Sequence, residues 1–345
     1  MQRMKRSIFK WLGYALLICL LLLCVAVFYP GNYNVPQLQT RAGTQYWKLK
    51  TGSAIGYTII AAKGEKKSYP IIYLHGGPGG YVSDKIIQTL SPLADEGYNV
   101  YLYDQVGSGQ SARLDDITQY TVGRHIVDLK EIIQNTGAQK VILIGQSWGA
   151  ILAALFAADN SDNIEKIIFT SPGPVYPVNN ELLKVKAPEN LHLKNPVFTN
   201  AQGNKVANNI RTMAMAYCAT TFGFKLSTDK EADNFDTYLN YELNKSTVCD
   251  TTKIPKQEAG GGYYAGIMTY KSLTTQKDPR PKIKALNVPV LIMKGQCDNQ
   301  PWGFTYEYTQ LFKNHQLIVI PNAGHYIALE QPALYIQTIK DFLNK

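Results

Sequence analysis

The chain has 345 residues, of which 45% are hydrophobic and 18% are charged, a composition that excludes intrinsic disorder as its main character. Its 27 glycines and 17 prolines are near average usage and exclude collagen-like or low-complexity architectures. The formal net charge of +9 does not indicate nucleic-acid binding, because Arg3, Lys5, Arg6 and Lys10 cluster in one short segment and no nucleic-acid-binding motif accompanies the remaining basic residues. We therefore expect a folded protein with a modestly basic surface and no nucleic-acid partner.

A stretch without charged residues runs from Trp11 to Tyr29. At about 1.5 Å rise per residue, a helix of this length spans the ~30 Å hydrocarbon core of a bilayer. The alternative is a cleaved signal peptide, but the run exceeds the usual ~7 to 15 apolar residues and Cys24-Val25-Ala26 is a poor cleavage site. Basic residues precede the run and are sparse after it, which predicts a cytoplasmic N-terminal side. We expect residues 1–29 to anchor a catalytic domain outside the cytoplasm; signal cleavage would make that domain secreted or periplasmic.

The five cysteines show neither a metal-ligand spacing nor a disulfide-dense pattern. Two lie in the apolar stretch, which leaves Cys218, Cys249 and Cys297. A Cys218–Cys249 disulfide in an oxidising compartment is one alternative, and free buried cysteines are the other.

After a polar linker over residues 30–44, short apolar runs alternate with stretches of helical length. The expected strands are Gly56 to Ala62, Pro70 to Leu74, Val100 to Tyr103, Val141 to Ile144, Lys166 to Thr170, Val288 to Met293 and Gln316 to Ile320; the expected helices include Ser83 to Glu96, Val122 to Thr136 and Gly149 to Ala158. This alternation predicts an α/β fold with a mostly parallel sheet covered on both faces. The pattern fails over residues 171–284, so we expect a core of residues 45–170 and 285–345 and an inserted, mainly helical cap over the carboxyl edge of the strands.

The strongest chemical motif is Gly145-Gln146-Ser147-Trp148-Gly149, which lies between an expected strand and an expected helix. A G-x-S-x-G turn in this setting exposes a serine oxygen, and its glycines allow a close approach that side chains would block. We therefore predict that Ser147 is a nucleophile. Because a serine hydroxyl is a poor nucleophile at neutral pH, it needs a base, and the base needs an acid to orient it.

Two later loops supply these groups. His325 follows the last expected strand, in Pro321-Asn322-Ala323-Gly324-His325, and Asp298 follows the strand before it, in Lys294-Gly295-Gln296-Cys297-Asp298. The chain order Ser147, Asp298, His325 is the order of α/β-hydrolase triads. We predict His325 as the base and Asp298 as the acid, whereas the other four histidines are structural or exposed, and Asp104 braces its own turn.

Attack on a carbonyl creates an oxyanion, which preorganised N–H groups must stabilise. The glycine-rich segment His75 to Gly80 follows an expected strand and predicts backbone donors at Gly76 and Gly77. The N–H of Trp148, directly after the nucleophile, is the expected further donor. No metal-binding motif is present, and the predicted chemistry requires no cofactor.

Together these segments resemble the proline iminopeptidase group of α/β-hydrolases. The motifs that carry the resemblance are H-G-G-P-G-G at 75–80, D-Q-V-G-S-G-Q-S at 104–111, G-Q-S-W-G at 145–149, G-Q-C-D-N-Q-P at 295–301 and A-G-H-Y at 323–326. The resemblance spans about residues 45–345. It implies a capped hydrolase core, a Ser147/Asp298/His325 triad, and release of an N-terminal residue, often proline, from small peptides or amides.

The chain departs from this family in two places. Val106 replaces the arginine of the family's D-Q-R-G-x-G turn, which removes a polar brace. In the family, cap glutamates of a W-x-x-W-E and an E-N-H-Y-F segment pair with the free ammonium of the substrate. Residues 238–242 resemble the first segment and make Glu242 a candidate; residues 260–264 match the second without an acid, so that Glu258 is the other candidate.

The sequence thus predicts a membrane-anchored serine hydrolase that acts on small peptides or amides as an aminopeptidase, through an acyl-enzyme. The alternative is a carboxylesterase or acyl amidase with the same triad, for which no free amine is needed. A third alternative is a non-catalytic hydrolase fold that binds a ligand, but such proteins usually lose a triad member and all three residues are present here.

Overall fold

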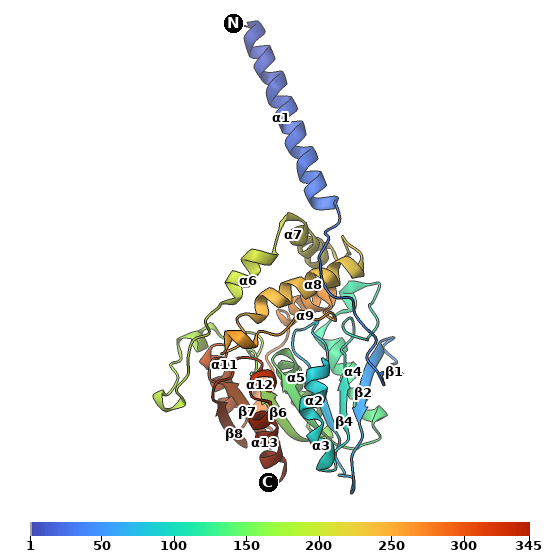
Figure 1. Cartoon of the computed structure of the whole chain (residues 1–345), viewed down its shortest axis with the longest axis vertical. Helices are drawn as coiled ribbons and strands as arrows, with labels where there is room; N and C mark the ends of the chain where they lie inside the picture. The colour runs from blue at the N-terminus through green and yellow to red at the C-terminus, as the bar shows by residue number, and fades with distance from the viewer. Residues whose placement is uncertain (1) are drawn as a thin grey trace.

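The computed structural model describes the backbone of residues 2–345 and the side chains from Lys10 onward (Figure 1). Its centre is an eight-stranded sheet in the order β1-β2-β4-β3-β5-β6-β7-β8. The β1 and β2 strands pair antiparallel, whereas β3 to β8 run parallel to one another. The strands are β1 (Gln45–Lys48), β2 (Ala54–Ile60), β3 (Ile71–Leu74), β4 (Val100–Tyr103), β5 (Val141–Gln146), β6 (Ile164–Thr170), β7 (Val290–Gly295) and β8 (His315–Ile320). The predicted α/β fold with a mostly parallel sheet is confirmed.

Helices cover both faces of this sheet. One face packs against α4 (Val122–Asn135), α5 (Trp148–Asn160), α10 (Arg280–Lys284) and α11 (Trp302–Leu311). The other packs against α2 (Asp84–Leu90), α3 (Pro92–Asp95), α12 (Ile327–Glu330) and α13 (Pro332–Leu343). In β3, Ile72 and Leu74 point to the first layer, whereas Ile71 and Tyr73 point to the second. Burial on both faces explains why this strand reads as an unbroken apolar run.

Two elements differ from the sequence prediction. The edge strand β1 was not predicted, because most of its four residues are exposed and it carries no apolar run. The predicted helix over residues 83–96 is divided into α2 and α3. Pro92 begins α3, and a proline lacks the N–H that a continuous helix would need there.

The cap lies between β6 and β7 and consists mainly of α6 (Asn200–Ala207), α7 (Ile210–Tyr217), α8 (Asp229–Asn244) and α9 (Tyr263–Leu273). Figure 1 shows these helices over one end of the sheet, where the parallel strands terminate. Helix α8 packs on both α6 and α9, whereas α10, the last helix of the predicted cap stretch, packs on α5 and α11 of the core. The segment over residues 30–44 contains no helix or strand.

Helix α1 (Gln2–Phe28) projects away from the remainder of the molecule (Figure 1). Its 19-residue part Lys10–Phe28 is long and apolar enough to cross a membrane, and none of it is buried. A signal sequence near the N-terminus has the same properties, so the helix itself fits both alternatives. The basic side chains of Arg3, Lys5 and Arg6, on which the predicted orientation depends, lie outside the described side chains.

Candidate active site

Ser147 occupies the sharp turn between β5 and α5. Its φ of 53° lies in the left-handed region, which side-chain-bearing residues rarely adopt. Its N–H donates to Thr170 O at 3.0 Å, which fixes the turn against β6. A side chain at Gly149 would collide with Leu74 O, so the glycine after the serine lets α5 pack directly on β3. The predicted strand, turn and helix context of Ser147 is therefore present.

Asp298 and His325 meet on the loops after β7 and β8. His325 Nδ1 lies 2.8 Å from Asp298 Oδ1, and because an ionised carboxylate only accepts, the imidazole donates from Nδ1. This bond leaves Nε2 as the ring nitrogen that can take a proton from a nucleophile. The Asp298 side chain is fully buried and that of His325 is 8% exposed.

Lys294 holds the other oxygen of the same carboxylate. Its Nζ lies 3.1 Å from Asp298 Oδ2 and also donates to Gln300 O at 2.8 Å. Gln300 N donates to Asp298 Oδ1 at 3.0 Å. Burial alone would raise the pKa of Asp298, but the Lys294 ammonium and then His325 outweigh it and hold that pKa well below its usual value. Asp298 is therefore a carboxylate at any physiological pH.

The glycine-rich loop after β3 lies against the nucleophile. A Cβ added to Gly76 would lie 3.2 Å from Ser147 Cβ and would collide with Gln146 Oε1. From the cap, Tyr270 Oη donates to Gly77 O at 2.9 Å and so holds the loop in place. The N–H of Trp148 is the first of α5 and has no carbonyl partner within that helix. Gly76 and Trp148 therefore lie next to Ser147, and the role of Gly76, Gly77 and Trp148 as oxyanion donors stays a prediction.

The other buried histidines have structural partners. His75 Nδ1 lies 2.8 Å from Gly76 O, and Gln105 N donates to its Nε2 at 2.9 Å, so both ring nitrogens are occupied. Burial lowers the pKa of His75, and it lowers the pKa of His125 to about 3. His125 Nε2 lies 3.0 Å from Thr269 Oγ1. Both are thus neutral side chains that brace the core.

A cavity of about 320 Å³ lies between the cap and the core beside these loops. Its lining includes Gln146 and Tyr326, the chain neighbours of Ser147 and His325, together with both predicted oxyanion glycines. Gln146 is a residue that the sequence prediction missed: its side-chain nitrogen is buried and has no hydrogen-bond partner among the described residues. The cap contributes Asp236, Thr237, Leu239, Asn240, Tyr241, Leu243, Asn244, Pro255, Lys256, Gln257, Glu258 and Tyr270 to the lining.

The two carboxylates predicted to bind an amine lie in different surroundings. Glu258 is exposed and lines the cavity, with its carboxylate 3.4 Å from Tyr81 Oη. Glu242 is not among the lining residues, and its carboxylate forms an ion pair with Lys245 on the same helix. The structure therefore brings Glu258 to the cavity and directs Glu242 elsewhere.

Asp236 on α8 is the cavity carboxylate that the sequence prediction missed. It makes no ion pair within the described residues; Asn240 Nδ2 donates to its Oδ2 at 2.7 Å. The side chain keeps some accessible surface, but protein atoms surround the carboxylate so closely that burial, followed by the charge of Asp233, raises the pKa of Asp236 to about 8. Asp233, one turn away, is paired with Arg113 at 2.9 Å.

The position of Asp236 explains the glycine run at residues 260–262. A side chain at Gly261 would collide with Asp236 Oδ2, and one at Gly260 would lie 2.6 Å from the ring of Tyr81. Gly262 N donates to Gly79 O at 2.8 Å, so this run packs directly on the predicted oxyanion loop. The carboxylate of Asp236 therefore lies beside residues 260–264. This segment resembles the family's second acidic motif but contains no acidic residue.

Arg41 is a third missed residue, in the predicted linker. Its Nη2 lies 3.0 Å from Asp104 Oδ2, and its Nη1 donates to Val82 O at 2.6 Å. Asp104 also accepts from Val82 N at 2.6 Å and from Gln110 N at 3.0 Å, which supports its predicted bracing role. The family has an arginine in this turn at the position of Val106. In this chain Arg41, from the preceding segment, brings a guanidinium to the same turn.

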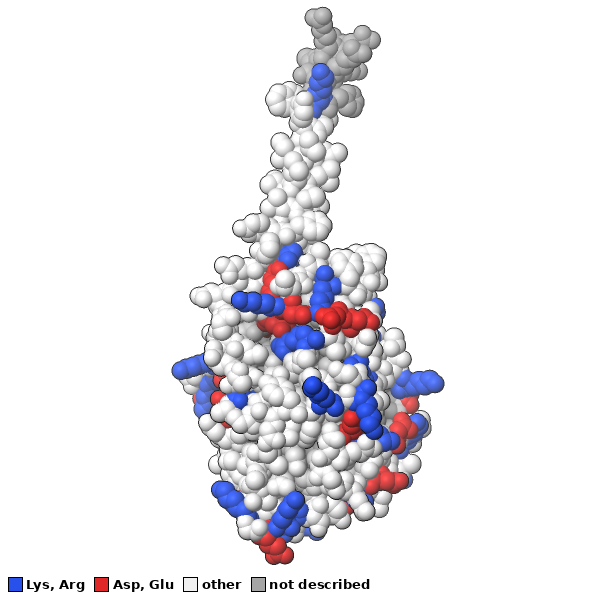
Figure 2. Space-filling model, turned by 90° about the vertical axis from the view of Figure 1, so that its right-hand side faces the viewer, with Lys and Arg blue, Asp and Glu red and all other residues white. Residues whose placement is uncertain are grey.

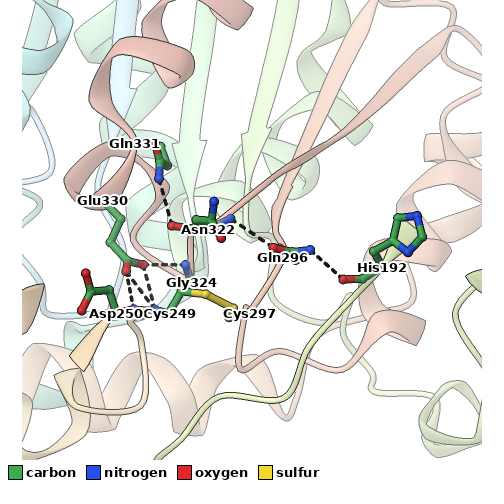
Figure 3. The surroundings of a disulfide bond; sticks show 9 residues. All are labelled: His192, Cys249, Asp250, Gln296, Cys297, Asn322, Gly324, Glu330 and Gln331. Carbon is green, nitrogen blue, oxygen red and sulfur yellow. Dashed lines mark hydrogen bonds between the residues drawn. A yellow bond between two sulfur atoms is a disulfide. The ribbon is translucent and has the colours of Figure 1, made fainter. Parts of the chain in front are cut away.

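The cysteines pair differently from the alternatives drawn from the sequence. Cys249 of the cap is bonded to Cys297, with Cα atoms 5.1 Å apart, and Cys218 is free (Figure 3). A Cys218–Cys249 disulfide is therefore wrong, as is the alternative that Cys249 is free. Cys297 directly precedes Asp298, so the bond joins the cap to the loop of the catalytic-acid candidate.

Glu330 strengthens the same junction. Its carboxylate is 4% exposed and accepts from Cys249 N and Asp250 N at 2.9 Å and from Gly324 N at 2.6 Å, as Figure 3 shows. Gly324 directly precedes His325. One buried carboxylate thus joins the cap segment to the loop of the predicted base.

Comparisons with known proteins agree with the observed fold. The family model described as "alpha/beta hydrolase fold" matches residues 69–332. A proline iminopeptidase of Heyndrickxia coagulans is 27% identical over 275 residues, which cover 80% of this chain and 90% of that protein. One of Saccharolobus solfataricus is 25% identical over 306 residues, with 87% and 92% covered. Among solved structures, an esterase from Exiguobacterium antarcticum has a TM-score of 0.57 at 17% identity and covers 87% of this chain and 99% of its own, a likeness of fold alone.

Proposed function

Since the chain belongs to the α/β-hydrolase fold family and is a proline iminopeptidase-like hydrolase, we propose that it is a serine aminopeptidase that removes an N-terminal residue, proline or another small apolar one, from peptides or amides. Ser147, His325 and Asp298 would act as nucleophile, base and acid. The names of the two relatives support this activity, and the paired side chains on the loops after β7 and β8 support the roles of His325 and Asp298.

In the proposed reaction, His325 Nε2 takes the proton of Ser147 Oγ as this oxygen attacks the substrate carbonyl. The resulting oxyanion accepts hydrogen bonds from the backbone N–H groups around Gly76, Gly77 and Trp148. His325 then gives its proton to the leaving amine, and a water molecule, activated by the same imidazole, hydrolyses the acyl-enzyme. Asp298 keeps the imidazole oriented and stabilises its charged form.

The observation that carries the aminopeptidase proposal is Asp236. A carboxylate that has no ion-pair partner among the described side chains, in a cavity bounded by the predicted oxyanion loop, is suited to a substrate ammonium group. Binding of a cation would favour the ionised form of Asp236, which burial disfavours in the empty cavity. Glu258, which also lines the cavity, would add a weaker, solvent-screened attraction.

Replacement of this carboxylate tests the proposal. We expect Asp236→Asn to lower kcat/KM for a free-amine prolyl arylamide by roughly 30-fold, because loss of one partner of a buried charged pair costs at least about 2 kcal/mol. The same substitution should change kcat/KM for the N-acetylated arylamide very little. Steady-state kinetics of the full chain in detergent micelles measure both.

Glu242→Gln is the matched control, since it removes a carboxylate from the same helix outside the cavity. It should leave the preference for the free amine unchanged. If Glu242→Gln removes that preference and Asp236→Asn does not, the assignment of Asp236 is wrong. Labelling of the parent chain, but not of Ser147→Ala, with a fluorophosphonate would separately identify the nucleophile.

An esterase or acyl amidase with the same residues is the second candidate. The raised pKa of Asp236 favours it, because a protonated carboxyl group in the empty cavity presents no charge to an uncharged acyl group. In that case the N-acetylated arylamide and an aryl ester would be cleaved at least as fast as the free amine, and Asp236→Asn would have no effect on the ratio.

We also propose that α1 anchors the enzyme in a membrane with the catalytic domain outside the cytoplasm. The apolar span of Lys10–Phe28 supports the anchor. The Cys249–Cys297 disulfide supports the compartment, because such bonds persist in oxidising environments and are rare in the cytosol.

A further inference from the structure

One side of helix α7 in the cap exposes apolar side chains. Ile210, Met213 and Tyr217 are spaced three and four residues apart, so they lie on the same face, and their exposed fractions are 53%, 64% and 60%. The opposite face of the helix, which carries Arg211 and Met215, is buried. The helix is therefore packed on the cap side, and its apolar outer face is left exposed by the part of the chain that the structure describes.

The next turn continues this face with an aromatic cluster. Tyr217 and Phe222 are in edge contact with ring centroids 5.6 Å apart, and Phe222 stacks on Phe224 at 6.2 Å. Phe222 is 63% exposed and Phe224 is 48% exposed. Large apolar side chains gathered in one exposed patch mark a contact surface, whereas isolated ones do not. We call residues 210, 213, 217, 222 and 224 the α7 patch.

The end of α1 is fixed beside the α7 patch. Arg211 Nη1 donates to Val27 O at 2.6 Å, and Gly31 N donates to Glu231 Oε1 at 2.7 Å. Arg211 and Glu231 also form an ion pair whose side chains are 8% and 9% exposed. Helices α1 and α7 are in contact, and Figure 1 shows α7 directly below the emerging helix. These bonds determine where the α7 patch lies relative to the apolar span.

We propose that the α7 patch lies in the interfacial layer of the membrane that α1 spans, so that the cap contacts the bilayer at a second place. The inference rests on the proposed membrane anchorage. A 19-residue span is about 29 Å long, so its end near Phe28 coincides with the level at which the hydrocarbon core gives way to headgroups. After Lys10, α1 carries no charged side chain, and Figure 2 shows this uncharged part of the helix down to the globular part, where charged residues begin.

A lipid interface fits the chemistry of the α7 patch better than water does. Tyr and other aromatic side chains accumulate at the headgroup level of membrane proteins, where one part of the ring is apolar and another is wet. Apolar side chains of a surface helix enter this layer to a depth of about 5 to 10 Å. The cap would thereby be held at the membrane surface, and the far end of the core, with α13, would point away from it.

The test uses the full chain in phosphatidylcholine nanodiscs with an environment-sensitive NBD label on a single introduced cysteine. The labelled variant is Phe222→Cys, in a chain that also carries Cys19→Ser, Cys24→Ser and Cys218→Ser; the Cys249–Cys297 bond stays oxidised. The matched control is Leu334→Cys, whose side chain is 39% exposed on α13, a helix of the core and not of the cap. The quencher is phosphatidylcholine with a doxyl group near the top of its acyl chain.

We expect the doxyl lipid to remove most of the emission at position 222 and none at position 334. The proposal would be overturned if the doxyl lipid left the emission at position 222 unchanged, as it should at position 334. A third sample labelled at native Cys19, with Cys24→Ser and Cys218→Ser, reports on α1 itself. Quenching at Cys19 without quenching at position 222 refutes the α7 patch while the anchor stands; no quenching at Cys19 refutes the anchor on which the inference rests.

Discussion

Lys294 is the residue whose charge acts most directly on the predicted acid. A buried ammonium on Asp298 Oδ2 competes with the imidazole on Oδ1 for the same negative charge. Its side chain is only 2% exposed, so solvent screens this interaction little. Lys294 is therefore a positioning residue, which holds the carboxylate plane and sets how much charge it offers to His325.

Replacement of Lys294 by methionine should change the pH dependence of the reaction. Lys294 contributes most to lowering the pKa of Asp298, and in Lys294→Met His325 alone balances the Asp298 charge, so the acidic limb of the kcat/KM profile should move to higher pH. Lys63→Met removes an exposed ion pair with Asp95 and should leave the profile unchanged. An unmoved acidic limb in Lys294→Met would mean that the ammonium only fills space.

Asp236 should give free-amine substrates a pH dependence of their own. Since its pKa in the empty cavity is about 8, the ionised form that attracts an ammonium becomes less populated by about tenfold per pH unit below 8. The ratio of kcat/KM for free over N-acetylated prolyl arylamide should therefore rise between pH 6 and about pH 8, because triad titration cancels in the ratio. In Asp236→Asn the ratio should be flat over this range; the same slope in parent and variant would contradict the assignment.

Candidate residues in a contiguous motif could be predicted from the sequence. Candidate residues that depend on contacts between distant segments could not. Ser147 could be recognised because its strand, turn and helix are contiguous. Asp236 could not, since its role depends on where α8 meets the glycine run at residues 260–262, more than twenty residues later. Arg41 reaches Asp104 across 63 positions, a pairing that no local pattern encodes.

At the scale of elements, the cap is joined to both catalytic loops at one place. The disulfide binds Cys249 to the loop of Asp298, and Glu330 binds the same cap segment to the loop of His325. A Cβ at Gly324 would collide with Thr247 O, so the segment lies in direct backbone contact with that loop. The geometry of Asp298 and His325 therefore depends on the cap remaining in place.

Removal of the disulfide should lower both stability and activity. The bond spans 48 positions, for which constraint of the unfolded chain predicts a loss of about 4 kcal/mol in the free energy of unfolding when it is absent. We expect this loss, together with a lower kcat, in the double variant Cys249→Ser/Cys297→Ser. Denaturant unfolding and steady-state kinetics measure the two effects. Cys218→Ser, which removes a free cysteine, is the control, and a double variant as stable as this control would contradict the account.

The core elements were predictable because burial on both faces of a parallel sheet leaves short apolar runs at regular spacing. All seven predicted strands are present within a few residues of their expected ends. The cap was predictable only as an interruption of this pattern. Its helices carry mixed polar and aromatic sequences, and their arrangement depends on the core beneath them, which explains why the partner of Cys249 was not found.

Across the whole molecule, the proposed membrane contact lies on the cap and the predicted catalytic residues lie on loops of the core. The cap carries the contacts to α1 on one side and Asp236 with Glu258 on the side of the cavity. The core supplies Ser147 and the loops around it. On the proposals made above, the insertion selects the substrate and adds a membrane contact to that of α1, whereas the chemistry belongs to loops of the sheet.

The measurement that tests the central claim most directly compares three substrates of the full chain in detergent micelles: a free prolyl arylamide, its N-acetylated form and a short-chain aryl ester, with Ser147→Ala as the blank. The account predicts a higher kcat/KM for the free arylamide than for its N-acetylated form. It also predicts that Ser147→Ala cleaves none of the three substrates. Cleavage of the ester alone, or equal rates for the free and acetylated amides, would contradict an aminopeptidase.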